Sequence, residues 1–269
     1  MASNFRNLMN MIPLGNLSPM AAYASEVSTI NYVDGTYGSD TNSGKTPGKA
    51  LKTIQKAIDR SRERGVTFVF PKKPTDLAVD PTSYAETLII PYTLEGYSLI
   101  GVGTGRTQGG LPQIKIGAGT TAMINIKAPG CSIANLGING ASSTGGGIKL
   151  TDDGTDPATT ATSFGTTVLN CHFKNCKTHA TQASAGGAIY TATTGGAWQL
   201  LVKGNRFYKC LGGIVVAGTS TSVPQDWVIE NNRFDSSVNT DVDADIYVAG
   251  SGVKGLTIKG NVFATVDVP

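Results

Sequence analysis

A short apolar and polar phrase recurs through the second half of the chain. Each copy begins with a β-branched residue, continues through Asn or Gly, and places a large apolar residue five positions after the first. The clearest copies are Val202–Phe207, Ile229–Phe234 and Ile258–Phe263, and weaker copies are Val168–Phe173 and Ile133–Ile138. The phenylalanines of the last four copies are 34, 27 and 29 residues apart. A period in this range predicts stacked structural repeats rather than one globular core.

A second phrase alternates with the first and predicts another short strand in each repeat. Its copies are Ile148–Leu150, Ile189–Thr191, Ile214–Val216 and Ile246–Val248. Because strand side chains alternate between two faces, the first apolar residue of each copy points inward and the next one outward. In the first phrase, the Asn or Gly that comes next occupies a sharp bend, because both residue types tolerate left-handed backbone. Stacked rungs place equivalent residues about 4.8 Å apart, so we expect ladders of like side chains.

The first 65 residues do not share this repeat. Pro47 follows Thr46, a residue type that caps helices, and Leu51, Ile54 and Ile58 then recur at helical spacing, with Gly65 as a plausible stop. We therefore expect one short amphipathic helix that plugs the first rung and protects its edge. Val66–Phe70 is expected as the first buried strand. The later rungs are expected at 87–90, 97–100, 113–116, 123–126, 132–138, 147–150, 166–173, 187–191, 199–207, 213–217, 227–234, 245–248 and 256–263.

The two phrases resemble those of a right-handed parallel β-helix of the pectate-lyase-like superfamily. The lead-in, Tyr32–Gly44 followed by Leu51–Ile58, is similar to the opening of many such domains, and the resemblance covers residues 31 to 269. It implies an all-β, single-stranded right-handed parallel β-helix over 66–269. An N-terminal extended arm (1–30) and a lead-in with a short capping α-helix (31–65) precede it. The fold hosts lyases, hydrolases, virus tailspikes and inert scaffolds, so it does not indicate one function.

Composition and charge narrow the classes of ligand. The net charge is only +3 on 269 residues and the basic residues are scattered, which does not favour nucleic-acid binding. No run of apolar residues approaches the ~20 that a membrane-spanning helix needs. The four cysteines show no spacing typical of zinc sites, and we expect no metal and no cofactor. Cys176 and Cys210 each lie three residues after a rung phenylalanine, so we expect two stacked thiols, close enough for a disulfide if their geometry agrees.

The N-terminal arm carries an unusual density of apolar residues. They are Phe5, Leu8, Met9, Met11, Ile12, Leu14, Leu17 and Met20. Asn and Pro residues interrupt them, which argues against a long helix and against the apolar core of a secretion signal, although Ala22–Ala24 resembles a cleavage site. We expect this arm to lie on a partner or on a neighbouring copy. The alternative is that it folds back over the open end of its own solenoid.

An enzyme with this fold would need two or three carboxylates on one outer face. Asp241, Asp243 and Asp245 alternate, so they would share a side if their stretch is extended, as a catalytic group or a cation site. Asp235 follows a rung phenylalanine and is the fourth candidate. A solvated edge is the simpler interpretation of the Asp241–Asp245 run.

Basic residues also recur at the outward rung position. Arg206 and Arg233 are expected to stack in adjacent coils, where they repel unless an anion or carboxylate lies between them. An acidic sugar or an acidic residue of a partner would neutralise this repulsion. Glu230 is one strand away, so it is not a clear counter-charge. His172 takes the same position one coil earlier and is expected on the surface.

The residues and the resemblance together favour a non-enzymatic structural protein of a virus particle. The combination resembles bacteriophage capsid cement or decoration proteins, several of which are homotrimers. This implies a location on the outer surface of the capsid, with the major capsid protein and further copies of this chain as partners. A tailspike-type polysaccharide lyase or glycoside hydrolase is the alternative, and a receptor-binding spike is a third. A glycan therefore stays a candidate ligand, whereas nucleic acid and membrane do not.

Overall fold

The computed structural model describes residues between 28 and 265, with gaps. The described stretches are 28–72, 82–103, 110–115, 122–140, 146–151, 163–176, 187–191, 197–210, 212–218, 223–236, 244–250 and 253–265. All eight apolar arm residues, from Phe5 to Met20, lie outside them, as do Asp241 and Asp243. Within these stretches nearly all regular structure is β-strand.

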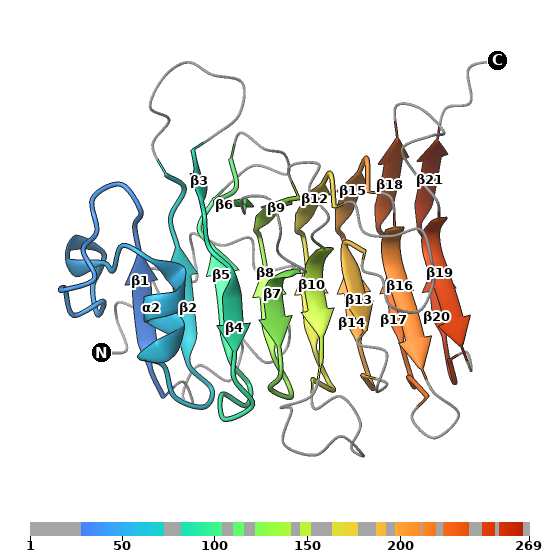
Figure 1. The fold of residues 1–269 in the computed structure, drawn as a ribbon, viewed down its shortest axis with the longest axis horizontal. Coiled ribbons are helices and arrows are strands. Elements are labelled where there is room, and N and C mark those ends of the chain that lie inside the picture. Colours follow the sequence, from blue (N-terminus) through green and yellow to red (C-terminus); the bar gives the residue numbers. More distant parts are fainter. Residues whose placement is uncertain are drawn as a thin grey trace.

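Three parallel sheets run along the molecule and hold the described strands (Figure 1). Sheet A has the order β1 (Ile30–Val33), β2 (Val66–Val69), β5 (Ser98–Gly101), β8 (Ser132–Ala134), β11 (Thr167–Leu169), β14 (Leu201–Lys203), β17 (Val228–Glu230) and β20 (Thr257–Lys259). Sheet B has the order β3 (Ser83–Tyr84), β6 (Gln113–Lys115), β9 (Gly137–Asn139), β12 (His172–Lys174), β15 (Arg206–Tyr208), β18 (Arg233–Ser236) and β21 (Val262–Thr265). Sheet C has the order β4 (Leu88–Ile90), β7 (Ala122–Ile126), β10 (Gly146–Leu150), β13 (Ile189–Thr191), β16 (Gly212–Gly218) and β19 (Ala244–Gly250). From β2 onward the chain visits A, B and C in turn, which confirms the predicted parallel β-helix.

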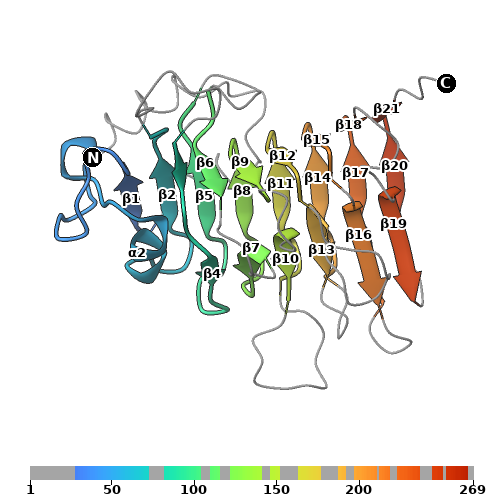
Figure 2. The same ribbon diagram turned by 45° about the horizontal axis from the view of Figure 1, so that its top comes forward.

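The interior of this solenoid is a continuous apolar core. Its most regular part is a column of four phenylalanine rings on sheet B. The ring centroids of Phe173 and Phe207 are 5.0 Å apart, those of Phe207 and Phe234 4.6 Å, and those of Phe234 and Phe263 5.1 Å, with interplanar angles of 5° to 8°. These spacings follow from the distance between adjacent parallel strands. The predicted column is therefore confirmed, and Figure 2 shows the coils stacked side by side along the long axis of the molecule.

The turn from sheet A to sheet B is the same two-residue corner in the last five coils. Its first residue has left-handed backbone, with φ of 55° at Asn135, 50° at Asn170 and 68° at Gly204. Its second residue points inward, and in the last three coils it is Asn205, Asn232 and Asn261. These side chains form a ladder: the Asn232 carboxamide oxygen accepts the backbone N–H of Asn205 (2.9 Å) and its side-chain amide (3.0 Å). The Asn261 oxygen serves Asn232 in the same way, at 2.9 and 3.0 Å.

The solenoid begins one strand earlier than the sequence predicted. Val66–Val69 is not the first strand, because β1 lies beside it in parallel, with Ile30 opposite Val66 and Val33 opposite Val69. The sequence interpretation missed β1 because Ile30–Val33 precedes the turn-rich lead-in and shows no copy of the repeat. Sheet A therefore extends one strand beyond sheets B and C at this end.

The predicted capping helix exists, but it is shorter than expected. Pro47–Lys49 forms a separate 3₁₀ turn (η4), and the α-helix α2 spans only Ile54–Asp59. Thr46 makes no side-chain capping bond, and Gly65 lies six residues beyond the helix, so both assignments were wrong. The helix packs its buried residues Ile54, Ala57 and Ile58 against the first strands, so it covers that end of the core.

Candidate functional site

The outward face of sheet B gathers the polar side chains with the most chemistry. Strand register defines two columns on this face. The first contains Ser83, Gln113, Gly137, His172, Arg206, Arg233 and Val262. The second contains Lys115, Asn139, Lys174, Tyr208, Asp235 and Ala264. The ionisable groups cluster on β12, β15 and β18, and this cluster is the candidate site.

Two arginines of the cluster share one carboxylate. Arg206 and Arg233 are register partners on β15 and β18, as predicted. The Nε of Arg206 lies 2.9 Å from the Asp235 carboxylate and the Nε of Arg233 lies 2.8 Å from it. The Asp235 side chain is only 10% exposed, and its hydrogen bond raises the pKa of Arg233. The negative charge that was predicted between the two arginines thus comes from Asp235 of the same chain, and this carboxylate links two neighbouring coils.

His172 lies next to this group and is buried, contrary to the predicted surface position. Its side chain is register partner to Arg206, yet the residue is only 6% exposed. Neither ring nitrogen has a hydrogen-bond partner among the described residues. Burial, together with the positive charges of Arg206 and Lys174, lowers its pKa to about 4. Because strand alternation gives only the direction of a side chain, the pattern could not predict that this outward residue is covered.

Asp245 connects the cluster to sheet C. It is the second residue of β19 and is partly buried. Burial raises its pKa, and the negative charge of Asp235 raises it as well, so the two carboxylates lie close enough to interact. Of the four acids predicted for a catalytic role, the structure brings Asp235 and Asp245 together. Asp241 and Asp243 lie outside the described residues, so their predicted common side stays a prediction.

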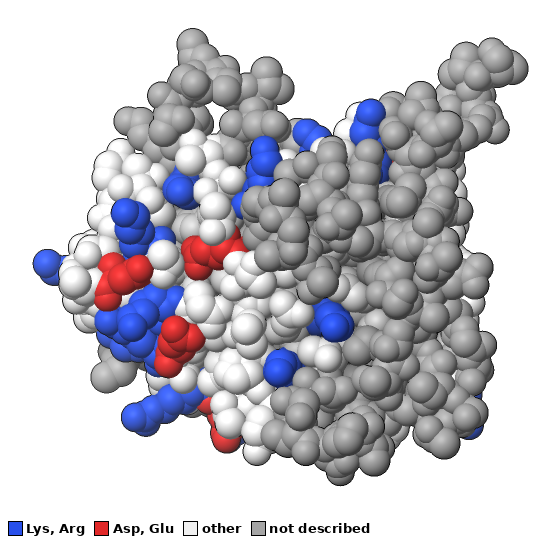
Figure 3. Space-filling view, in the orientation of Figure 1, with Lys and Arg blue, Asp and Glu red and all other residues white. Residues whose placement is uncertain are grey.

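Glu230 belongs to a different face. It lies on sheet A between Lys203 and Lys259, its register partners, with N–O distances of 2.7 and 3.0 Å. These two lysines lower the pKa of the carboxyl group. The resulting Lys–Glu–Lys ladder again joins consecutive coils. Charged side chains of both signs also gather at the end of the molecule that carries α2 (Figure 3).

The cysteines behave as small core residues. Cys131, Cys171, Cys176 and Cys210 are all buried free thiols. The side chains of Cys176 and Cys210 contact each other, as their spacing predicted, and this contact raises the pKa of Cys176 together with burial. A thiol with a raised pKa is a poor nucleophile, so Cys176 is not a candidate for covalent catalysis.

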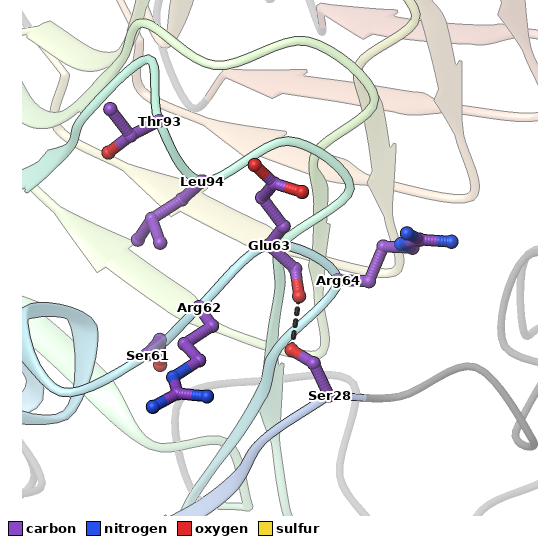
Figure 4. Close-up of a pocket in the computed structure, with 7 residues that line it drawn as sticks. All are labelled: Ser28, Ser61, Arg62, Glu63, Arg64, Thr93 and Leu94. Atoms are coloured by element: carbon purple, nitrogen blue, oxygen red, sulfur yellow. Dashed lines mark hydrogen bonds between the residues drawn. The ribbon is translucent and has the colours of Figure 1, made fainter.

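A hollow of about 490 Å³ lies near the end of the molecule that carries α2 (Figure 4). Its walls are Ser28, Ser61, Arg62, Glu63, Arg64, Thr93 and Leu94. The Ser28 hydroxyl donates a hydrogen bond to the Glu63 carbonyl across its rim. No group of three or more metal-ligating side chains occurs within the described stretches. No helix among the described residues is long and apolar enough to cross a membrane.

Comparison with solved structures supports the fold. The crystal structure of Escherichia coli YbhC is similar over 89% of this chain, with a TM-score of 0.57 and 14% sequence identity. A rhamnogalacturonan lyase structure matches 90% of the chain with a TM-score of 0.42 and 14% identity. The chain spans 66% of the length of each of these proteins. No family model matches the sequence, and no curated protein does. The chain thus has a parallel β-helix fold.

Proposed function

We propose that this protein is a non-enzymatic structural protein of a virus particle, and that it decorates the outer surface of a bacteriophage capsid. The observation that supports this role is how the solenoid uses its charges. Asp235 holds Arg206 and Arg233 together, and Glu230 holds Lys203 to Lys259. Both carboxylates join consecutive coils of the protein. Such ladders suit a rigid building block.

The proposed partners are the major capsid protein and further copies of this chain, with a homotrimer as the expected assembly. Stacked rungs make each coil depend on its two neighbours, which favours a stiff spacer on a lattice. The apolar arm, residues 1–30, is the proposed attachment element. Its sequence is rich in Leu, Met and Ile, which are suited to an apolar groove on the coat.

The test is electron microscopy of the virus particles whose genome encodes this chain, labelled with a gold-conjugated antibody against the solenoid. We expect regular labelling of the capsid surface. Purified full-length chain should also rebind to particles that have been stripped of it, and a variant that lacks residues 1–28 should not. Labelling confined to tails, or equal rebinding without the arm, would overturn the proposal.

A glycan-active enzyme is the second candidate, and Asp245 is the observation that favours it. Two neighbouring carboxylates with different environments are a common arrangement for an acid and a base. Asp235 is held by two arginines, whereas the pKa of Asp245 is raised by burial. The test is release of reducing ends or unsaturated products from a panel of neutral and acidic polysaccharides. Asp245→Asn should abolish any activity, while Asp226→Asn, at a distant turn, should not.

A further inference from the structure

The C-terminal coil leaves its end of the solenoid uncovered by any described residue. Strands β19, β20 and β21 are each the last strand of their sheet. Ile258 is 47% exposed and Phe263 is 54% exposed, whereas their register partners one coil earlier, Ile229 and Phe234, are fully buried. An uncovered strand edge next to bare apolar side chains is a surface that pairs readily with another extended segment.

The asparagine ladder makes this open end selective for a segment that carries a carboxamide side chain. The carboxamide oxygen of each asparagine accepts the backbone N–H of the corner residue one coil earlier, which is Cys171, Asn205 or Asn232, so the ladder has a direction. Asn261 gives its oxygen to Asn232 and donates its side-chain amide to the Ile229 carbonyl at 2.9 Å. Its own backbone N–H has no acceptor among the described residues. The open end therefore presents the N–H of Asn261, which can donate to a carboxamide oxygen. Two residues later it presents the ring of Phe263, which can pack against a large apolar side chain.

The N-terminal part of the chain contains that spacing twice. Asn7 is followed two residues later by Met9, and Asn10 is followed two residues later by Ile12. Both repeat the spacing of Asn261 and Phe263, on the β21 side of the corner. Pro13 has no backbone N–H, so a paired run ends before it.

We propose that residues Asn7–Ile12 of one copy add a strand beside β21 on the open end of a second copy. The geometry of sheet A supports a second copy as the source. The described chain begins at Ser28, just before β1, and β1 and β20 are opposite edges of that sheet. Seven strand spacings, about 34 Å, separate these edges within one copy. End-to-end copies bring the start of β1 directly to the open end. This inference rests on the proposed structural role and assigns the arm a first partner.

The test is sedimentation velocity of the purified full chain over a concentration series. We expect concentration-dependent self-association. The double variant Asn10→Lys/Ile12→Lys removes the residues with which the arm would bind, and Phe263→Lys removes the exposed ring of the open end. Each variant should therefore sediment as a monomer. The matched control is Phe164→Lys, which changes a similarly exposed aromatic residue on a side turn and should associate like the wild type.

Mixing the two monomeric variants gives the decisive result. One retains an intact open end and the other retains an intact arm, so the mixture should form a 1:1 complex and nothing larger. A fluorescein-labelled peptide of residues 1–27 should bind the arm variant, and Phe263→Lys should weaken its binding about tenfold or more. A wild-type chain that is monomeric at all concentrations, or a mixture that stays monomeric, would overturn the inference. Neither result bears on capsid attachment, which is measured with particles.

Discussion

The two ends of the solenoid are built on opposite principles. At the N-terminal end, side chains and turns occupy the exposed strand edges. The Gln55 side chain accepts the backbone N–H of Ile89 (2.8 Å) and donates to its carbonyl (3.2 Å), as a neighbouring strand would. The backbone of Leu51 pairs with Tyr32 and Asp34 beside β1. At the C-terminal end, Phe263 and Ile258 are half exposed. The repeat itself does not determine how a solenoid ends; individual residues outside it do.

The aromatic column gives the largest expected contrast between the interior and the open end. Phe207 is 2% exposed between two rings, so Phe207→Ala should reduce the free energy of unfolding by about 4 kcal/mol. Phe263→Ala should cost only about 1–2 kcal/mol, because half of that ring already contacts solvent. Urea denaturation of both variants measures the difference. Equal losses would show that the open end is covered in solution.

The asparagine ladder gives a second contrast of the same kind. Asn232→Ala removes the acceptor of the Asn205 N–H and the donor to the Val202 carbonyl, and both groups are buried. We expect a loss of about 3 kcal/mol, because each buried group left unpaired costs about 1–3 kcal/mol. Asn261→Ala at the end of the ladder should cost about half as much. Urea midpoints of the two variants at one pH provide the comparison.

The pH dependence of stability reports on His172, which lies in the middle of the solenoid. The pKa of His172 is about 4 in the folded protein, against about 6.5 for an unperturbed histidine. Between these values the unfolded chain takes up the proton and the folded chain does not. Stability should therefore fall by up to about 3 kcal/mol as the pH decreases from 6.5 to 4.

The variant His172→Gln isolates this effect. The pKa values of Glu86 and Asp245 are raised, so these groups act in the opposite direction and stabilise the fold as the pH falls through their folded pKa values. Both are unchanged in the variant. The difference between the wild-type and variant profiles thus reports on His172. Parallel profiles over this range would contradict its buried, neutral state.

The smallest expected effect tests the cap on the N-terminal end. The Glu86 carboxylate accepts the backbone N–H groups of Ile54 (3.0 Å) and Gln55 (2.9 Å), the first two residues of α2. Glu86→Ala should therefore cost about 1 kcal/mol. Hydrogen exchange should show faster opening of α2 with little change near the phenylalanine column. Glu95→Ala, at an exposed turn, serves as the control and should leave both unchanged.

The interior could be predicted from the sequence, whereas at the ends only the existence of the capping helix could. Copies of one phrase, 27 to 34 residues apart, led directly to the Phe173–Phe263 column, because stacking converts a sequence repeat into spatial neighbours. Arg206 and Arg233 were paired by the same reasoning, since strand register is a property of the repeat. The covered position of His172 and the role of Glu86 have no such signal. The role of Glu86 depends on a helix outside the repeat that meets it only after folding.

The functional assignments divide in the same way. The charge of Asp235 raises the pKa of Asp245. Asp235 also pairs with Arg206 and Arg233, and the sequence predicted a counter-charge there without naming this acid. Asp241, Asp243 and the arm residues fall in segments outside the described structure. Their proposed roles therefore depend on the experiments above.

The constant two-residue corner between sheets A and B determines where this protein tolerates length changes. In the last five coils that corner never varies, whereas the B-to-C connection ranges from three residues (209–211) to fourteen (175–188). A peptide grafted at Gly204–Asn205 would displace the amide ladder and misalign every later coil. The same peptide grafted between β15 and β16 would leave the stack in register. One edge of the molecule can therefore diversify, or display foreign epitopes, while the axis remains unchanged.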